Sequence, residues 1–341
     1  MLLAFLTSAN CTGRSSNSAK PHENRIKNAL HTAIVDTRKQ HYSYLEMIGD
    51  LDELQKRFPQ CVSYEMRSKT YQGRNIPVLY LGNRNAGKYV LVQSAIHARE
   101  YMSTLLVMAM LEHYARLYDT GSYQNTPIRN IFSKVCFVIL PMVNPDGVEI
   151  AQKGEKGAVT EDVKRWVREH KKAGMSHTQI KSNACGVDLN RNFANGFGKD
   201  RRRKPNKSYS HYPGKHPYSE IESQLLKTIA EEHHFTCFLN YHTHGNLVYY
   251  GCKNAKTAVN EKATRMAQLI KRHTSYPLYG SQTSPECGSW GDEVELKYGS
   301  PSATIELGTR NPVPIAEFND LFGKNKWVWA DLAIAIVDHK L

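Results

Sequence analysis

The sequence predicts an α/β/α sandwich, in which a sheet is buried between two layers of helices. Apolar runs of strand length alternate with segments of helical periodicity along most of the 341 residues. The runs are continuously apolar, which is typical of a sheet that is covered on both faces. With 40% hydrophobic residues, the chain can bury the core of one large domain of this kind or of two ordinary ones.

The first forty residues are expected to form a leader or a disordered tail. They are polar, rich in Ser, Asn, Lys and His, and show no sustained periodicity. The opening MLLAFLTSANCTGRSS has a short apolar core without basic residues before it, so it resembles a truncated secretory signal only in part. We therefore expect a tail over 1–40 and one folded domain over 41–341.

The domain is expected to open with a helix over 44–58 that ends at Pro59. Its apolar residues recur at three-residue spacing and would form one face, namely Leu45, Ile48, Leu51 and Leu54. Two further helices are expected at 103–118 and 315–338. Strands are expected at 76–82, 88–96, 134–143, 235–242, 246–251 and 302–308.

The composition excludes several classes of protein. The net charge of +13 suits an anionic partner such as nucleic acid, lipid or cell wall, but the densest basic run, KDRRRKPNK at 199–207, contains Pro205 and no aromatic residue. We interpret that run as a solvated loop and expect no nucleic-acid binding. No apolar run reaches the roughly 18 to 20 residues of a membrane span.

The seven cysteines lack CxxC spacing, which argues against a zinc knuckle or a redox pair. Cys136 and Cys237 lie in strand-like runs, where a buried thiol acts as a small hydrophobe.

Polar motifs follow four of the expected strands. HARE follows 88–96, NPDG follows 134–143, HTHG follows FTCFLNY at 235–241, and Glu306 lies within SATIELG. In sheets of this class, ligands bind beyond the ends of the central strands. The sequence therefore predicts one pocket at these four strand ends.

The residues of this pocket match the ligand set of a hydrolytic zinc site. Such sites use three protein ligands, for example two histidines and one glutamate, and leave a fourth position for water. His97 and Glu100 are three residues apart and would be neighbours on a tight turn. His242 is a candidate third ligand, although the nearby His244 offers an alternative.

These segments, taken together, resemble the zinc carboxypeptidases of the carboxypeptidase A superfamily, metallopeptidase family M14. The resemblance runs from about Tyr44 to the C-terminus and includes bacterial members that cleave γ-D-glutamyl-diaminopimelate bonds. It is carried, in the family's order, by YQGRNIPVLYLG, IHAREYMS, PMVNPDGVE, GVDLNRNF, HYPGKHPYSE, NYHTHGNLVYY and ATIELG. It implies that 41–341 is a catalytic domain whose central sheet is mixed, mostly parallel and twisted.

The resemblance implies one Zn²⁺ per chain, held by His97, Glu100 and His242. Asp188 matches the aspartate that hydrogen-bonds the first zinc histidine and fixes its tautomer. Glu306 matches the general base, which takes a proton from zinc-activated water and passes it to the leaving amine.

The same resemblance assigns substrate-binding roles. Arg99 would line the substrate groove. Asn190 and Arg191 match the pair that grips the free C-terminal carboxylate of the substrate, because a guanidinium holds a carboxylate with two hydrogen bonds and an amide adds a directional donor.

The chain departs from the family pattern at three places. The arginine that stabilises the oxyanion in digestive members is missing, and Lys181 is its expected replacement, with Arg165 or Arg168 as alternatives. The region of the mobile tyrosine contains Ser284, and the nearby Tyr279 is out of register. Gly291 stands where the family sets its preference for the terminal side chain, which leaves the pocket floor unassigned.

The function expected from the resemblance is hydrolysis of the amide bond next to a C-terminal residue with a free carboxylate. A murein peptidase that cleaves γ-D-glutamyl-diaminopimelate bonds is the alternative, since GVDLNRNF and YHTHGNLVYY resemble that group and a basic protein suits an anionic wall. A non-catalytic peptide-binding relative is a third candidate, which the presence of Glu306 argues against. A hydrolase of N-acyl amino acids would normally lack the NRNF context. We expect a secreted or cell-envelope location, with a cytoplasmic one and the oligomeric state left open.

Overall fold

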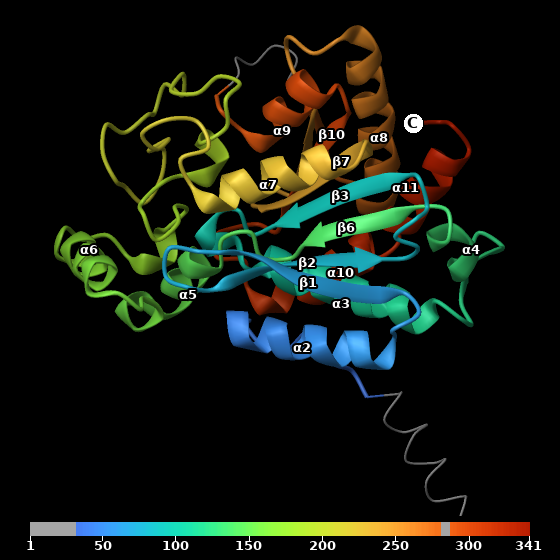
Figure 1. Ribbon diagram of the computed structural model, residues 1–341, viewed down its shortest axis with the longest axis horizontal. Helices are drawn as coiled ribbons and strands as arrows, with labels where there is room; N and C mark the ends of the chain where they lie inside the picture. The colour runs from blue at the N-terminus through green and yellow to red at the C-terminus, as the bar shows by residue number, and fades with distance from the viewer. Residues whose placement is uncertain (1–31, 281–286) are drawn as a thin grey trace, which may run out of the picture. The chain divides into compact units, whose positions relative to one another are not determined.

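The computed structural model describes residues 32–280 and 287–341, and its main compact unit runs from Val35 to Leu341 (Figure 1). The unit is built on an eight-stranded sheet with the strand order β1-β2-β6-β3-β7-β10-β8-β9. The strands are β1 (Val62–Lys69), β2 (Asn75–Leu81), β3 (Tyr89–Ser94), β6 (Cys136–Leu140), β7 (Phe235–Thr243), β8 (Leu247–Tyr250), β9 (Leu278–Gly280) and β10 (Ser302–Leu307). A separate two-stranded sheet pairs β4 (Ser122–Tyr123) with β5 (Thr126–Pro127).

The centre of the main sheet is parallel. β6, β3, β7 and β10 run in one direction, and β8 and β9 are also parallel to each other. The other three pairings are antiparallel. This confirms the predicted mixed, mostly parallel sheet, and it places the carboxyl ends of four central strands at one edge.

Helices cover both faces of the sheet (Figure 1), which confirms the α/β/α sandwich. Their bounds are α2 (Tyr44–Arg57), α3 (Met102–Leu117), α4 (Ile128–Phe132), α5 (Pro145–Lys153), α6 (Glu161–Lys172), α7 (Ile221–Glu232), α8 (Thr257–Thr274), α9 (Trp290–Glu293), α10 (Phe318–Asn325) and α11 (Val328–Val337). On one face, the apolar sides of α7 and α9 pack in a common core with β2, β3, β6 and β7.

Strand alternation separates the two faces. On β7, Phe238 packs against Trp290 of α9 at a centroid distance of 5.9 Å. Tyr241, of opposite parity, accepts a 3.1 Å hydrogen bond from the indole of Trp329 on α11. Because successive side chains of a strand point to opposite faces, His242 shares the face of Phe238. The pocket side of the sheet is therefore the α7 and α9 side.

The first helix differs from its prediction in its buried face. It ends at Arg57, just before Pro59 as expected, but Leu45 is 75% exposed, whereas Met47 is fully buried with Leu51 and Leu54. The helix begins at a capping box between Ser43 and Glu46, which fixes its first turn. The expected face was therefore confirmed at Leu51 and Leu54 but was wrong at Leu45, and the buried residues follow a spacing of four and three.

The expected closing helix over 315–338 is divided in the structure. A 3₁₀ turn over Ile315–Glu317 leads into α10, and α11 starts only at Val328. The break falls at Trp327, whose ψ of −4° departs from helical geometry. Its ring stacks on Tyr123 with centroids 4.9 Å apart, so tertiary packing overrides the helical pattern of the sequence.

The structure also bears on membrane-spanning segments and on the cysteines. Within the described ranges, no helix is long and apolar enough to cross a membrane. The six cysteines of those ranges have free thiols, and Cys136 and Cys237 are fully buried on β6 and β7 as predicted. Residues 1–31, which make up most of the expected tail, lie outside the described residues.

The corrected face of α2 can be tested by a matched pair of variants. Met47→Ala should lower the free energy of unfolding by about 2–5 kcal/mol, because it leaves a cavity in the core. Leu45→Ala should change it by less than about 0.5 kcal/mol, as expected for an exposed position. Chemical denaturation followed by circular dichroism measures both values. A larger loss for Leu45→Ala would restore the face expected from the sequence.

Candidate metal centre and substrate pocket

The three expected metal ligands come from two adjacent parallel strands. β3 ends at Ser94, and the following 3₁₀ turn over Ala98–Glu100 directs the Glu100 side chain back toward His97. His242 lies near the end of β7. Since β3 and β7 pair in parallel, the segments that leave them meet at one edge of the sheet.

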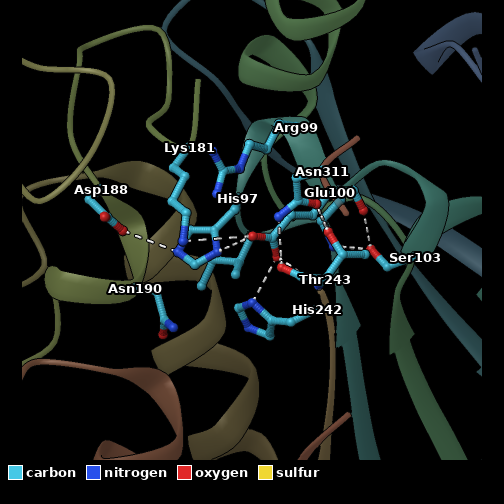
Figure 2. A network of polar contacts seen from close by, with 12 residues as sticks. His97, Arg99, Glu100, Ser103, Lys181, Asp188, Asn190, His242, Thr243 and Asn311 are labelled. Atoms are coloured by element: carbon cyan, nitrogen blue, oxygen red, sulfur yellow. Dashed lines mark hydrogen bonds and ion pairs between the residues drawn. The ribbon is translucent and has the colours of Figure 1, made fainter. Parts of the chain in front are cut away.

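Glu100 stands between the two histidines (Figure 2). Its Oε1 atom lies 2.9 Å from Nδ1 of His97, and its Oε2 atom lies 3.0 Å from Nδ1 of His242. Ligand atoms of all three side chains lie within 4.8 Å of one another, and all three residues are buried. The backbone N–H of Thr243 also donates to Oε2, at 3.2 Å. Protein groups alone thus fix the position of the Glu100 carboxylate.

The charges of the cluster fit a cation. Burial opposes ionisation of Glu100, but the charges and hydrogen bonds of His97 and His242 outweigh it and hold the pKa of Glu100 well below its usual value. On the far side of the first histidine, Asp188 Oδ1 lies 3.3 Å from His97 Nε2, and both atoms are buried without another hydrogen-bond partner among the residues that the structure describes. A buried set of two imidazoles and one carboxylate, with an acid behind the first imidazole, is the donor set of hydrolytic zinc sites.

A cavity of about 480 Å³ opens beside this cluster. Its lining contains His97, His242, Lys181, Asn190, Arg191 and Glu306. The structure therefore brings together two of the proposed metal ligands, the expected base, the expected cation and the expected carboxylate-binding pair.

Glu306 reaches the cavity through strand register. It is the Cα partner of His242 across β10 and β7, so both side chains point to the same face. Burial and the nearby Glu100 carboxylate raise the pKa of Glu306 to about 7, against the lowering effect of His242, Lys181 and Arg99. A carboxyl group with a pKa near neutrality is suited to both accepting and donating a proton.

Asn190 and Arg191 lie on a 3₁₀ turn over Leu189–Arg191. The Oδ1 atom of Asn190 accepts a 2.9 Å hydrogen bond from the backbone N–H of Trp290, which leaves its NH₂ group as a donor. Lys181 lies beside the cluster, with Nζ 3.9 Å from Glu100 Oε1 (Figure 2). Asn190 and Lys181 thus both present nitrogen donors to the cavity that they line.

Three other expected residues do not line the cavity. Arg99 does not line the cavity, and its Nη1 atom contacts the carbonyl oxygen of Gln179 at 3.5 Å. Arg165 and Arg168 are on α6, where Arg168 pairs with Glu155 and Glu161 beside a different cavity. Of the three candidate cations, only Lys181 is at the pocket.

The positions expected for the lid residue and the pocket floor differ in whether they line the cavity. Ser284 lies outside the described residues. Tyr279 is 51% exposed on β9 and does not line the cavity, although its ring centroid lies 5.9 Å from that of Tyr249, which does. Gly291 does line the cavity, and a Cβ atom placed on it would come no closer than 3.5 Å to Ser302 Oγ. A side chain at position 291 would therefore be in ordinary van der Waals contact with β10 and would take up part of the cavity.

Several residues that line the cavity were not predicted from the sequence. Asn240, Thr304 and Ser302 line the cavity together with Tyr249 and Cys287. The first three precede His242 and Glu306 by two or four residues, so strand alternation alone would have placed them on the same face. Tyr249 and Cys287 carried no such signal.

Comparisons of the sequence identify related proteins. Residues 47–306 match the family model of the zinc carboxypeptidases, peptidase family M14. Gamma-D-glutamyl-L-diamino acid endopeptidase 1 of Lysinibacillus sphaericus is 25% identical over 288 residues, which cover 83% of this chain and 70% of that protein. Metallocarboxypeptidase A of Trichophyton rubrum is 25% identical over 274 residues, covering 75% of this chain and 60% of that protein.

Solved structures agree with the fold. The carboxypeptidase A of Helicoverpa armigera aligns with a TM-score of 0.65 at 22% identity and covers 94% of this chain and 82% of that one. Thrombin activatable fibrinolysis inhibitor aligns with a TM-score of 0.70 at 17% identity and covers 93% of this chain and 80% of that one. Since the family model spans most of the catalytic domain, this chain belongs to the zinc carboxypeptidases of metallopeptidase family M14.

Proposed function

We propose that this enzyme hydrolyses the amide bond that precedes a C-terminal residue with a free carboxylate. The observation that supports it most strongly is the shared lining of one cavity by His97, His242, Glu306, Asn190 and Arg191. A metal centre, a base and a carboxylate anchor on the walls of one pocket suit a substrate whose scissile bond lies close to its terminal carboxylate.

His97, Glu100 and His242 would hold the zinc ion, with the acid of Asp188 orienting His97. When bound, zinc supplies a Lewis acid that polarises a carbonyl and makes water a stronger nucleophile near neutral pH. The contribution of the protein is to present two Nδ1 atoms and a carboxylate that are already grouped and buried.

Glu306 would act as the general base and then as the general acid. Its carboxylate accepts a proton from the attacking water and returns it to the nitrogen of the leaving amine. Lys181 would oppose the negative charge that develops on the carbonyl oxygen. Because its ammonium is a single point charge, it gives less directional support than an arginine would.

Cleavage of murein peptides is a second candidate, favoured by one specific observation. The relative from Lysinibacillus sphaericus is named as a gamma-D-glutamyl-L-diamino acid endopeptidase, and 83% of this chain aligns with it. The net charge of +13 would also favour approach to an anionic wall. A cell-envelope or secreted location is the corresponding proposal.

Removing one histidine should remove the metal. His242→Ala should lower zinc content from one ion per chain to far below one, because it deletes a ligand. His244→Ala is the matched control, since His244 is exposed two residues further on and should leave zinc content unchanged. Elemental analysis of dialysed protein, with circular dichroism as a check of folding, gives both results. Full zinc retention by His242→Ala would overturn the ligand assignment.

Replacing the base should separate metal binding from turnover. Glu306→Gln should keep its zinc while kcat falls by about 10²–10⁴-fold, the usual contribution of a positioned acid or base. Glu222→Gln is the control, because burial also raises the pKa of Glu222, to about 8, and this residue does not line the cavity. Steady-state kinetics and zinc analysis measure both variants. Near-normal turnover by Glu306→Gln would remove Glu306 from the proposed role.

The substrate class can be decided directly. The zinc-loaded enzyme is incubated with linear peptides and, separately, with a murein tripeptide that contains the γ-D-glutamyl-diaminopimelate bond. Mass spectrometry should detect release of the C-terminal residue from linear peptides. Cleavage of the murein tripeptide alone would assign the second candidate, and cleavage of neither would contradict both.

A further inference from the structure

The basic loop 199–207 contains one acidic residue, Asp200, whose side chain points inward while its neighbours are exposed. Residues 201–207 are all exposed, as expected for a solvated loop. Asp200, at the start of the same run, has a side chain that is only 9% exposed. Burying a carboxylate is unfavourable unless it is paired and hydrogen-bonded. The inward position of Asp200 therefore calls for partners that compensate its buried charge.

The carboxylate of Asp200 faces the expected substrate anchor. Its Oδ2 atom accepts a 2.6 Å hydrogen bond from Nε of Arg191 and lies 2.8 Å from Nδ1 of His211. Its Oδ1 atom accepts from the backbone N–H of Arg202 at 2.9 Å. Burial opposes ionisation, but these hydrogen bonds outweigh it and lower the pKa of Asp200 strongly.

These contacts fix the orientation of the Arg191 guanidinium. Asp200 occupies Nε, and the carbonyl oxygen of Asn190 accepts a 2.6 Å hydrogen bond from Nη1. Among the described residues, Nη2 of Arg191 has no hydrogen-bond partner, and Arg191 lines the cavity. The terminal edge of the guanidinium is thus left for a ligand, while its Nε side is held by the protein. A side chain that is held before binding loses less entropy when the substrate arrives.

His211 joins this anchor to the metal centre. Its ring contacts Asp200, while its backbone N–H donates a 2.8 Å hydrogen bond to Oδ2 of Asp188. Asp188 in turn faces His97. His211 has a φ of +62°, a left-handed conformation that non-glycine residues seldom adopt. This conformation allows one residue to serve both carboxylates.

We propose that Asp200 is a positioning residue, which acts through Arg191 and sets the direction in which the guanidinium meets the substrate carboxylate. His211 supports Asp200 and fixes its distance from Asp188. The inference rests on the proposed function of Arg191 as the carboxylate anchor. An acid that only competed with the substrate for Arg191 would instead weaken substrate binding, and its removal would lower KM.

The test compares Asp200→Asn with the unchanged enzyme on two ligands. The first is an N-acylated dipeptide with a free terminal carboxylate, and the second is its C-terminal amide, used as a competitive inhibitor. We expect KM for the first to rise about tenfold, the size of effect of losing a charge-assisted hydrogen bond. We expect kcat, zinc content and the inhibition constant of the amide to stay within about twofold. An unchanged or lower KM would overturn the inference.

A double-mutant cycle shows whether Asp200 acts through Arg191. Arg191→Ala should raise KM for the free-carboxylate dipeptide more than Asp200→Asn does, and adding Asp200→Asn to Arg191→Ala should have no further effect. A further rise in the double variant would mean that Asp200 acts by another route. If Arg191→Ala itself leaves KM unchanged, the anchor proposed above is wrong. If only Asp200→Asn leaves it unchanged, the positioning inference alone is wrong.

A matched control is available on the other side of the sheet. Asp331 on α11 accepts hydrogen bonds from Arg272 and His273 at 3.2 and 3.1 Å, the same two donor types that Asp200 has. Asp331→Asn should lower thermal stability without changing KM. A similar change in KM for both variants would show that the effect of Asp200→Asn reflects general loosening of the fold.

Discussion

The pocket depends on the burial of one carboxylate. Glu100 is only 1% exposed and is held by two imidazoles and a backbone N–H. Because a buried negative charge is costly without compensation, its surroundings must supply positive charge. The imidazoles and the backbone N–H supply hydrogen bonds, and a divalent cation held by all three side chains would supply the compensating positive charge. The turn after β3 and the ends of β7 and β10 are arranged to meet this requirement.

Much of this arrangement could be predicted because it follows from strand ends. HARE, HTHG and ELG are polar interruptions of apolar runs, and parallel strands bring their carboxyl ends to one edge. The resemblance to a known family then supplied Asn190, Arg191 and Asp188, which no periodicity would have singled out. The face of α2 could not be predicted as well, because Leu45 and Met47 are both apolar and their spacing from Leu51 and Leu54 fits a helix face in either case, so that only the tertiary packing shows which of them is buried.

Asp200 illustrates a different limit. In the sequence it is one acid among many basic residues, and its neighbours are solvated, so the run reads as a loop without a role. Its contacts depend on Arg191, nine positions earlier, and on His211, eleven positions later. Neither helical nor strand periodicity relates residues at such spacings in irregular structure. Only the folded path of the loop shows that an acidic side chain in a cationic segment is directed inward.

The register between β7 and β10 constrains how such chains can diverge. His242 and Glu306 share a face because they are Cα partners in parallel strands. One residue inserted before either of them within its strand would turn that side chain toward the face of Tyr241 and Trp329, which is filled with aromatic rings. The loops between the strands are under no such restriction. Length differences between β8 and β10 leave this pairing intact, whereas a one-residue gap before His242 in β7 or before Glu306 in β10 would turn that side chain away from the pocket.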